Sequence, residues 1–393
     1  MFPKLRFKEF DDDWSPYVLK DFVSFRKGKG ISKADISENG INECIRYGEL
    51  YTTYGQVIDH IHSKTNVSKS ECILSKAGDV IIPASGETQI DIATASCVLH
   101  DDIILSGDLN ILSHEENGSW LAYYLSSAKK LEIAQLAQGN SVVHLYSSQL
   151  KDLKINKPSK EEQTKIASFL SNVDEKISQL TKKHELLSQY KQGMMQKLFS
   201  QQIRFRADDG SEFGEWASEK ISKVFTNKSK SFNPLLNESL PCIELEHLSQ
   251  NTGQILGTVN SSDQQSTKNL FEPNSVLYGK LRPYLRKFAK PQFKGVCSSE
   301  IWVLTGLKIS NDYLFQFVQS EQFTELTNIQ SGSKMPRADW NVIADAEIEF
   351  PCLGEQTKIA NFLSSIDQKI EVVAQQLEQA KQWQKGLLQQ MFI

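Results

Sequence analysis

The sequence predicts an α+β fold: two tandem mixed α/β domains, each followed by a long helix, the two helices forming an antiparallel coiled coil with pseudo-two-fold symmetry. Three observations support this. A 38-residue segment occurs twice, at 162–199 and 355–392, and the copies align without a gap with 17 identical positions. Apolar residues in both copies alternate at spacings of three and four, the heptad pattern of a coiled coil. Each copy also follows a segment of domain size.

We expect the two helices to pair through an apolar seam. At 1.5 Å per residue, each would be about 57 Å long. Lys191 and Gln384 occupy equivalent polar positions in the seam, and such residues commonly fix the register. A generic dimerising coil would also show heptads, but it does not explain two copies in one chain, each behind a domain-sized segment. The predicted seam residues are Ile166, Leu170, Val173, Ile177, Leu180 and Leu187 in the first copy, and Ile359, Leu363, Ile366, Ile370, Val373 and Leu377 in the second.

The duplication is wider than the helices. Leu5-Arg6-Phe7 followed by Trp14 matches Ile203-Arg204-Phe205 followed by Trp216. We therefore expect globular domains at 1–157 and 201–350 and long helices at 158–200 and 351–393. Within the halves, apolar or alternating runs predict strands at 71–74, 80–83, 108–112, 276–278 and 300–304. Matching helices are predicted at 119–138 and 312–330, each with a Gly just past its end.

Composition limits the classes of protein to consider. The formal net charge is −4 and the pI about 6.0, so any nucleic-acid surface must be local. The six Cys residues show no C-x-x-C spacing, which indicates scattered buried thiols in a reducing compartment. No apolar run approaches the length of a membrane span and the start of the chain lacks a signal-peptide core, so we expect a cytoplasmic protein.

One stretch has the composition of a nucleic-acid contact. Residues 273–299 contain basic residues with interleaved aromatics and no Asp or Glu. Such side chains suit phosphate contact, base stacking and base-edge readout, although a solvated charged loop is an equally open interpretation. In the first half, the segments 25–30 and 46–54 offer similar side chains. The loops after the short helices, around Gly139 and Gly332, are a third candidate, because Gly allows close approach of backbone to a phosphate.

Signals of catalysis are missing. The sequence has no P-loop, no GxGxxG after a strand and no motif typical of amino-methyltransferases or nucleases. His60 and His62 are a possible metal pair, but a surface strand is the better interpretation without nearby carboxylates or thiols. We therefore expect no catalytic, cofactor-binding or metal-binding residues in this chain.

The duplicated helices, the repeated Arg-Phe…Trp openings and the Pro, Glu, Gln and Ile that begin each helix together resemble the specificity (S) subunit of type I restriction–modification systems. The resemblance covers essentially the whole chain. It implies two target-recognition domains, each reading half of a bipartite, asymmetric site in double-stranded DNA. It also implies a non-catalytic spacer that docks two methyltransferase (M) subunits, joined by restriction (R) subunits. S-adenosylmethionine, ATP and Mg²⁺ would belong to those partners.

Recognition loops diverge freely, so the DNA contacts are candidates chosen by residue type. Two other functions stay open: a coiled-coil scaffold that joins two protein-binding domains without DNA recognition, and an enzyme with an unrecognised site. The candidates are Arg26, Lys27, Lys29, Arg46, Tyr47, Tyr51, Thr52, Tyr54, Gly139, Asn140, Ser141 and His144 in the first half, and Lys280, Arg282, Tyr284, Arg286, Lys287, Gly332, Ser333, Lys334 and Arg337 in the second.

Overall fold

The structure is a computed structural model that describes residues 3–139, 141–329 and 335–392. It divides into two compact units, each combining one globular half with part of each long helix. The first unit is Met1–Thr181 with Gln375–Ile393, and the second is Lys182–Ala374. Among the described residues, no helix is long and apolar enough to cross a membrane.

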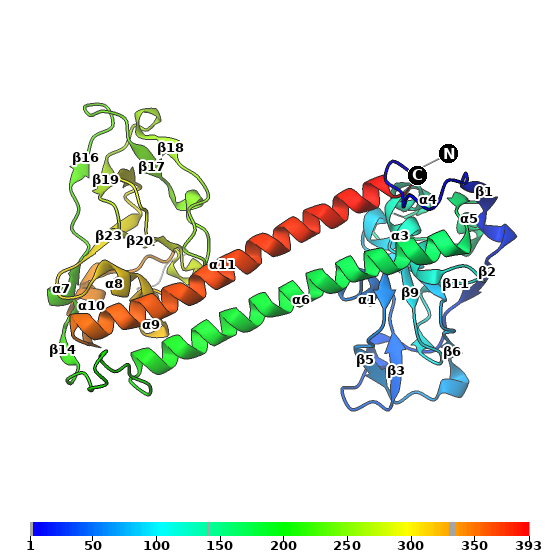
Figure 1. Ribbon diagram of the computed structural model, residues 1–393, viewed down its shortest axis with the longest axis horizontal. Helices are drawn as coiled ribbons and strands as arrows, with labels where there is room; N and C mark the ends of the chain where they lie inside the picture. The colour runs from blue at the N-terminus through cyan, green and yellow to red at the C-terminus, as the bar shows by residue number, and fades with distance from the viewer. Residues whose placement is uncertain (1–2, 140, 330–334, 393) are drawn as a thin grey trace. The chain divides into compact units, whose positions relative to one another are not determined.

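In the first unit, two mixed sheets form the globular half (Figure 1). The strand order is β2-β11-β7-β9-β4 in one sheet and β5-β3-β10-β6 in the other, with β4 parallel to β9 and β3 parallel to β10. The strands of the first sheet are β2 (Ser24–Lys27), β11 (Leu109–Ser113), β7 (Val80–Pro83), β9 (Ser96–Val98) and β4 (Val57–Ile58), and those of the second are β5 (Ser63–Thr65), β3 (Asn42–Ile45), β10 (Ile104–Leu105) and β6 (Ile73–Leu74). Two strand pairs complete the unit, β1 (Ser15–Val18) with β13 (Lys154–Lys157) and β8 (Ser85–Gly86) with β12 (Val143–His144).

The second unit has a related two-sheet plan, although every strand pairing described in its first sheet is antiparallel. Its sheets have the orders β15-β23-β20-β21 and β16-β19-β22-β17-β18. The strands are β15 (Phe225–Thr226), β23 (Ile301–Gly306), β20 (Val276–Gly279) and β21 (Phe288–Ala289) in the first sheet, and β16 (Ser231–Phe232), β19 (Lys268–Phe271), β22 (Gly295–Cys297), β17 (Pro241–Ile243) and β18 (Val259–Asn260) in the second. The pair of β14 (Ala217–Lys220) with β24 (Glu347–Phe350) corresponds to β1 with β13.

The helices confirm the two long predictions and correct the two short ones. The long helices are α6 (Lys160–Phe199) and α11 (Leu353–Gln390). The single helix predicted at 119–138 is two helices, α3 (Gly118–Ser127) and α4 (Lys130–Leu136), and that at 312–330 is α8 (Asn311–Phe317) and α9 (Glu321–Asn328). In the second case Ser320 breaks the helix, because its side chain accepts a hydrogen bond from the Phe323 N–H and so begins a new one. The remaining short helices are α1 (Glu49–Thr52), α2 (Gln89–Ile92), α5 (Ser147–Leu150), α7 (Ile221–Val224) and α10 (Trp340–Asp345).

Four of the five predicted strands correspond closely to observed strands. The prediction at 71–74 was too long, because Lys69–Glu71 forms a 3-10 turn and only Ile73–Leu74 is a strand. The surface strand predicted for His60 and His62 was also wrong, since both lie between β4 and β5, where the His62 N–H donates to the Tyr54 hydroxyl at 2.9 Å.

The same contacts hold the start of each long helix. Arg6 donates to Glu162 at 2.7 Å, and Arg204 donates to Glu355 at 2.8 Å. Both carboxylates are buried, so each needs its guanidinium partner. The neighbouring Gln163 and Gln356 each accept from a backbone N–H, of Asn117 and of Ser310, and each donate to the carbonyl of the Pro ahead of the helix. These contacts explain why the openings and the helix starts carry the repeated motifs.

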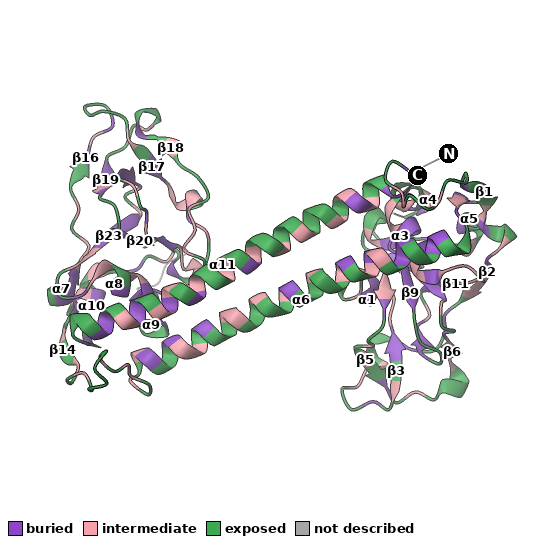
Figure 2. Cartoon of the chain, in the orientation of Figure 1, coloured by how far each residue is buried: buried purple, intermediate pink, exposed green. Residues whose placement is uncertain are grey.

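Both long helices contribute to the core of each unit. In the first unit, Ile166 and Leu170 of α6 share a cluster with Leu387 near the end of α11 and with Met391 and Phe392 just past it. In the second, Ile359 and Leu363 of α11 share a cluster with Met195 and Leu198 from the end of α6. Figure 2 shows buried positions where the helices meet these cores, whereas Leu187 and Leu377, near the middle of each helix, are only half-buried.

Candidate nucleic-acid interface

In the first unit, the predicted DNA-contacting segment 25–30 has one of its cations bound to groups inside the protein. Arg26 lies on β2 and its guanidinium donates to Asp79 at 2.6 Å and to the Leu74 carbonyl at 3.2 Å. Asp79 is buried, so this ion pair is part of the core. Lys27 and Lys29 are exposed, and within the described ranges no carboxylate pairs with them. Of this segment, the two lysines are the cations available to a ligand.

The second predicted segment lies beside the first at the end of β10. The Lys29 N–H donates to the Leu105 carbonyl, and the Tyr47 N–H donates to the Ser106 hydroxyl at 3.1 Å. Gly28 packs so closely here that a Cβ at this position would lie 1.9 Å from the backbone carbonyl oxygen of Ser106, so no larger residue fits. The fold therefore brings together two segments that are about twenty residues apart in the chain.

The segment at 46–54 is ordered around a buried carboxylate. Glu49 accepts from the Arg46 backbone N–H at 2.8 Å, from the Arg46 side chain at 3.3 Å, and from the Ser63 hydroxyl. Tyr47 and Tyr54 pack on the local apolar cluster, and burial raises the pKa of Tyr54 to about 12. Tyr51 is half-buried and Thr52 exposed on α1, where Thr52 donates to the Gly48 carbonyl.

The loop after α4 turns at Gly139, whose φ of +127° is a backbone conformation that favours glycine. Ser141 and His144 beyond it are exposed, and the His144 ring stacks on Tyr146 with centroids 6.3 Å apart. Asn140 lies outside the described residues, as do Gly332, Ser333 and Lys334 of the corresponding loop.

In the second unit, the predicted residues of 280–287 form one turn between β20 and β21. Arg337 lies beside it, because Leu281 and Arg337 form an antiparallel bridge. Several cations of the basic stretch 273–299 and its surroundings already form ion pairs within the protein. Arg337 pairs with Glu300 at 3.1 Å, Lys294 with Glu272 at 2.9 Å, and Lys290 with Asp312. Lys287 donates to the Leu245 carbonyl at 2.6 Å. Tyr284 is exposed at the tip of the turn.

Sequence reasoning missed the partners of the polar seam residues. In the second unit, Lys191 forms an ion pair with Asp367 at 2.5 Å, and Gln316 donates to the same carboxylate at 3.1 Å. In the first unit, Gln384 and Tyr123 donate to Asp174, Tyr123 at 2.5 Å. The repeat aligns Asp174 with Asp367 and Gln384 with Lys191, so equivalent positions form a charged cluster in one unit and an uncharged donor set around a carboxylate in the other. Burial lowers the pKa of Lys191 and raises the pKa of Asp174.

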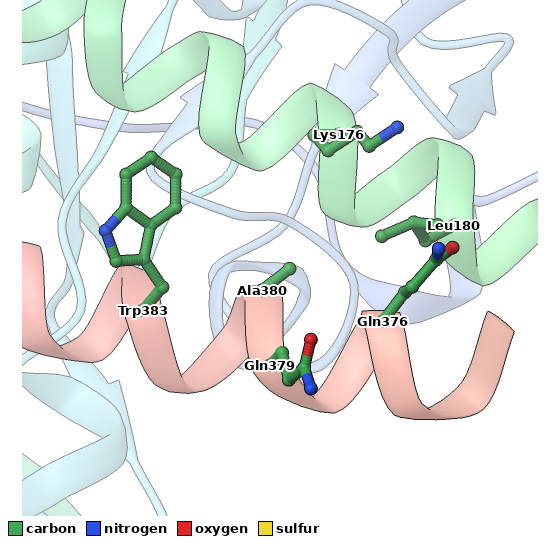
Figure 3. Close-up of a pocket in the computed structure, with 6 residues that line it drawn as sticks. All are labelled: Lys176, Leu180, Gln376, Gln379, Ala380 and Trp383. Atoms are coloured by element: carbon green, nitrogen blue, oxygen red, sulfur yellow. The ribbon is translucent and has the colours of Figure 1, made fainter. Parts of the chain in front are cut away.

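The first unit also carries an open groove between α6 and the end of α11. Figure 3 shows the Trp383 ring beside it, with Leu180 and Ala380 on its apolar wall. Lys176, Gln376 and Gln379 supply its polar side chains. Trp383 is 53% exposed, which is unusual for the largest apolar side chain, and it packs edge-on against Phe169. No group of three or more His, Cys, Asp or Glu side chains in the described part of the chain could hold a metal ion.

The repeated globular half with its helix segments is a duplicated architecture, and comparison with known proteins assigns it to a family. The family model described as the type I restriction modification DNA specificity domain matches residues 11–188 and again 215–382. The chain belongs to this family, and the two matches confirm the predicted tandem duplication.

Individual relatives are consistent with this assignment. The chain is 24% identical to the type I restriction enzyme MjaVIII specificity subunit of Methanocaldococcus jannaschii, over 96% of this chain and 91% of that protein. It is 24% identical to the EcoDI specificity subunit of Escherichia coli over 66% of this chain and 65% of that protein. In fold, it is similar to the crystal structure of the type I S subunit from M. genitalium, with a TM-score of 0.66, 16% identity, and coverage of 100% and 99% of the two chains.

Proposed function

We propose that this chain is the DNA-specificity subunit of a type I restriction–modification complex, reading a bipartite, asymmetric site through one target-recognition domain in each half. The observation that carries the proposal is the double match to the specificity family combined with the divergence of the loops on a shared frame. Two readers with different loops and one scaffold suit two different half-sites, because loops carry specificity while the scaffold positions them.

We propose domains at 1–157 and 201–350 and spacer helices at 158–200 and 351–393, the helices forming an antiparallel coiled coil with a pseudo-two-fold axis. The equivalent contacts within each unit support this arrangement. Phe392, just past the end of α11, packs on Trp14 and Tyr124 of the first half. Its counterpart Phe199, at the end of α6, packs on Tyr313 and Phe317 of the second half. Each half thus receives the start of one helix and the end of the other. A spacer of about 57 Å would set an upper limit of roughly 17 base pairs between half-site centres.

The partners follow from the same assignment. Two methyltransferase subunits would dock on the spacer and restriction subunits would join the assembly, bringing S-adenosylmethionine, ATP and Mg²⁺ with them. The exposed Trp383 and the apolar wall of its groove fit a docking surface, since aromatic residues are enriched at protein interfaces. The chain itself would bind no cofactor and catalyse no reaction. A coiled-coil scaffold without DNA recognition is the competing function.

The test is to map methylated bases in DNA treated with cognate methyltransferase subunits, with and without this chain. We expect methylation at one bipartite sequence only when the chain is present, and none when the chain is given S-adenosylmethionine, ATP and Mg²⁺ alone. Binding of the complex to DNA should weaken as salt is added. If the complex forms but its DNA binding shows neither salt dependence nor sequence preference, the scaffold function is favoured. Sequence-specific methyl transfer by the chain alone would contradict the non-catalytic assignment.

A further inference from the structure

We propose that the two arginines of the 280–287 turn have different roles: Arg282 reads a base of the second half-site, and Arg286 is a positioning residue that ties the turn to the polar seam of the long helices. This inference rests on the proposed function and assigns roles within its second recognition domain. By sequence the two residues are equivalent, since both belong to the same basic stretch.

The backbone of the turn is held in a conformation that non-glycine residues rarely adopt. A 3-10 turn at Pro283–Leu285 is flanked by Arg282 with φ +52° and Arg286 with φ +48°. Neither residue is Gly or Asn, so each left-handed conformation is unfavourable unless surrounding contacts stabilise it. Those contacts are present: the Arg282 N–H donates to the Pro336 carbonyl at 2.8 Å, and the Asn251 N–H donates to the Arg286 carbonyl at 3.0 Å. These hydrogen bonds therefore fix the backbone conformation of the turn before any ligand binds.

The Arg286 side chain points back into the unit. Its guanidinium donates to the Gln319 carbonyl and lies 3.5 Å from a Glu321 oxygen at the start of α9. The side-chain oxygen of the same Gln319 accepts from Lys191 at 2.7 Å, and Lys191 pairs with Asp367 at 2.5 Å. Gln319 thus connects the turn to the ion pair between buried Lys191 and half-buried Asp367. A guanidinium engaged in this way cannot also form a bidentate contact with a base edge.

The Arg282 side chain has the opposite surroundings. It is exposed, and no hydrogen-bond or ion-pair partner meets it among the residues that the structure describes. Tyr284, two residues on, exposes 54% of its surface and can stack on a base or pack against a sugar. A free guanidinium on an ordered turn suits bidentate recognition of guanine O6 and N7, because the backbone of the turn is already fixed and the planar fork matches both acceptors. We therefore assign a guanine in the second half-site to Arg282.

The experiment uses the full chain assembled with its methyltransferase subunits and a library of DNA sites in which the second half-site is randomised. Arg282→Ala and Arg282→Lys should each lower preference for guanine at one position by about tenfold or more, leaving the other positions and the first half-site unchanged. Arg286→Ala should instead weaken preference across the whole second half-site and raise amide hydrogen exchange in 280–287. Arg206→Ala is the matched control, since that exposed arginine pairs only with Glu212 among the described residues and lies outside the turn.

The outcomes separate this inference from the proposed function. If the wild-type complex modifies no sequence-specific site, the proposed function fails before either variant is compared. If wild type is specific but Arg282→Ala keeps its base preference, the assignment of Arg282 is overturned. If Arg286→Ala changes one base position while hydrogen exchange in the turn stays at the wild-type level, Arg286 is a base reader and the division of roles is wrong.

Discussion

At the scale of single residues, Asp174 and Asp367 are equivalent carboxylates in opposite situations. Asp367 has a cation, Lys191, whereas the hydrogen bonds to Asp174 from Tyr123 and Gln384 come from neutral groups. Burial therefore raises the pKa of Asp174, and those hydrogen bonds only partly oppose the shift. A carboxyl whose pKa is higher in the folded than in the unfolded protein favours folding most when it is protonated. The contribution of Asp174 to the free energy of unfolding therefore declines as pH rises through its folded pKa.

We predict that Asp174→Asn stabilises the protein at neutral pH, because it removes a half-buried charge. The amide oxygen can accept from Gln384, and the amide NH2 can donate to the Tyr123 hydroxyl, which accepts as well as donates. The gain should shrink as pH falls below the folded pKa, where the native carboxyl is also neutral. Denaturant unfolding at a series of pH values measures this. Asp367→Asn is the matched comparison and should destabilise at neutral pH, since it leaves Lys191 without its counter-ion. Equal destabilisation by both variants at neutral pH would show that the Asp174 carboxylate is net stabilising.

At the scale of elements, the polar cluster around Lys191 holds α6 against α11 and α8 within the second unit. Lys191 is buried, and burial lowers its pKa because the charged form loses hydration, while Asp367 opposes that shift. Removing Asp367 would leave the Lys191 charge buried and uncompensated, whereas removing Lys191 would leave a carboxylate that is only half-buried. The cluster should therefore set the register of the helix segments in this unit.

Lys191→Ala should destabilise the second unit by less than the about 3–5 kcal/mol typical of a fully buried ion pair, because the Asp367 carboxylate that it leaves behind is 35% exposed. Gln384→Ala, at the equivalent position of α11, removes one neutral donor and should cost about 1–3 kcal/mol, because Tyr123 still donates to Asp174. Denaturant unfolding followed by hydrogen exchange in each unit measures both. A smaller effect for Lys191→Ala than for Gln384→Ala would mean that the ion pair does not stabilise the helix packing.

At the scale of the whole molecule, the duplication predicts what half of the chain would do. A fragment of residues 1–200 exposes the seam of α6, and each buried Leu or Ile there is worth about 1.5–3 kcal/mol. A second copy can supply the missing helix end, so we expect a dimer with a true two-fold axis. In it, Lys191 of the partner copy would occupy the position of Gln384 and meet Asp174, which has no cationic partner among the described residues.

Sedimentation should find that dimer, and Lys191→Gln in the same fragment should weaken it. With methyltransferase subunits present, the dimer should direct methylation to a palindromic site built from the first half-site. A monomeric fragment, or a dimer that still directs methylation to an asymmetric site, would contradict the antiparallel arrangement of the helices.

The sequence by itself determined the duplication, the two long helices and the family, because a repeat and a heptad pattern are visible in residue order alone. It placed β7 and β20 nearly to the residue for a similar reason: buried strands are continuous apolar runs. It could not find the breaks within the short helices, which depend on local capping by side chains such as Ser320.

Only the tertiary structure decided the contacts of the charged and polar groups. Arg26 and Arg286 belong to basic stretches as Lys27 and Arg282 do, yet Arg26 pairs with a buried carboxylate and Arg286 donates to a carbonyl far along the chain. Asp174 and Asp367 occupy equivalent positions of the repeat, yet Asp174 accepts a hydrogen bond from neutral Gln384 whereas Asp367 forms an ion pair with Lys191. Hydrophobic periodicity is a local property of a segment, whereas the partner of a charge is set by which distant segments the fold brings together.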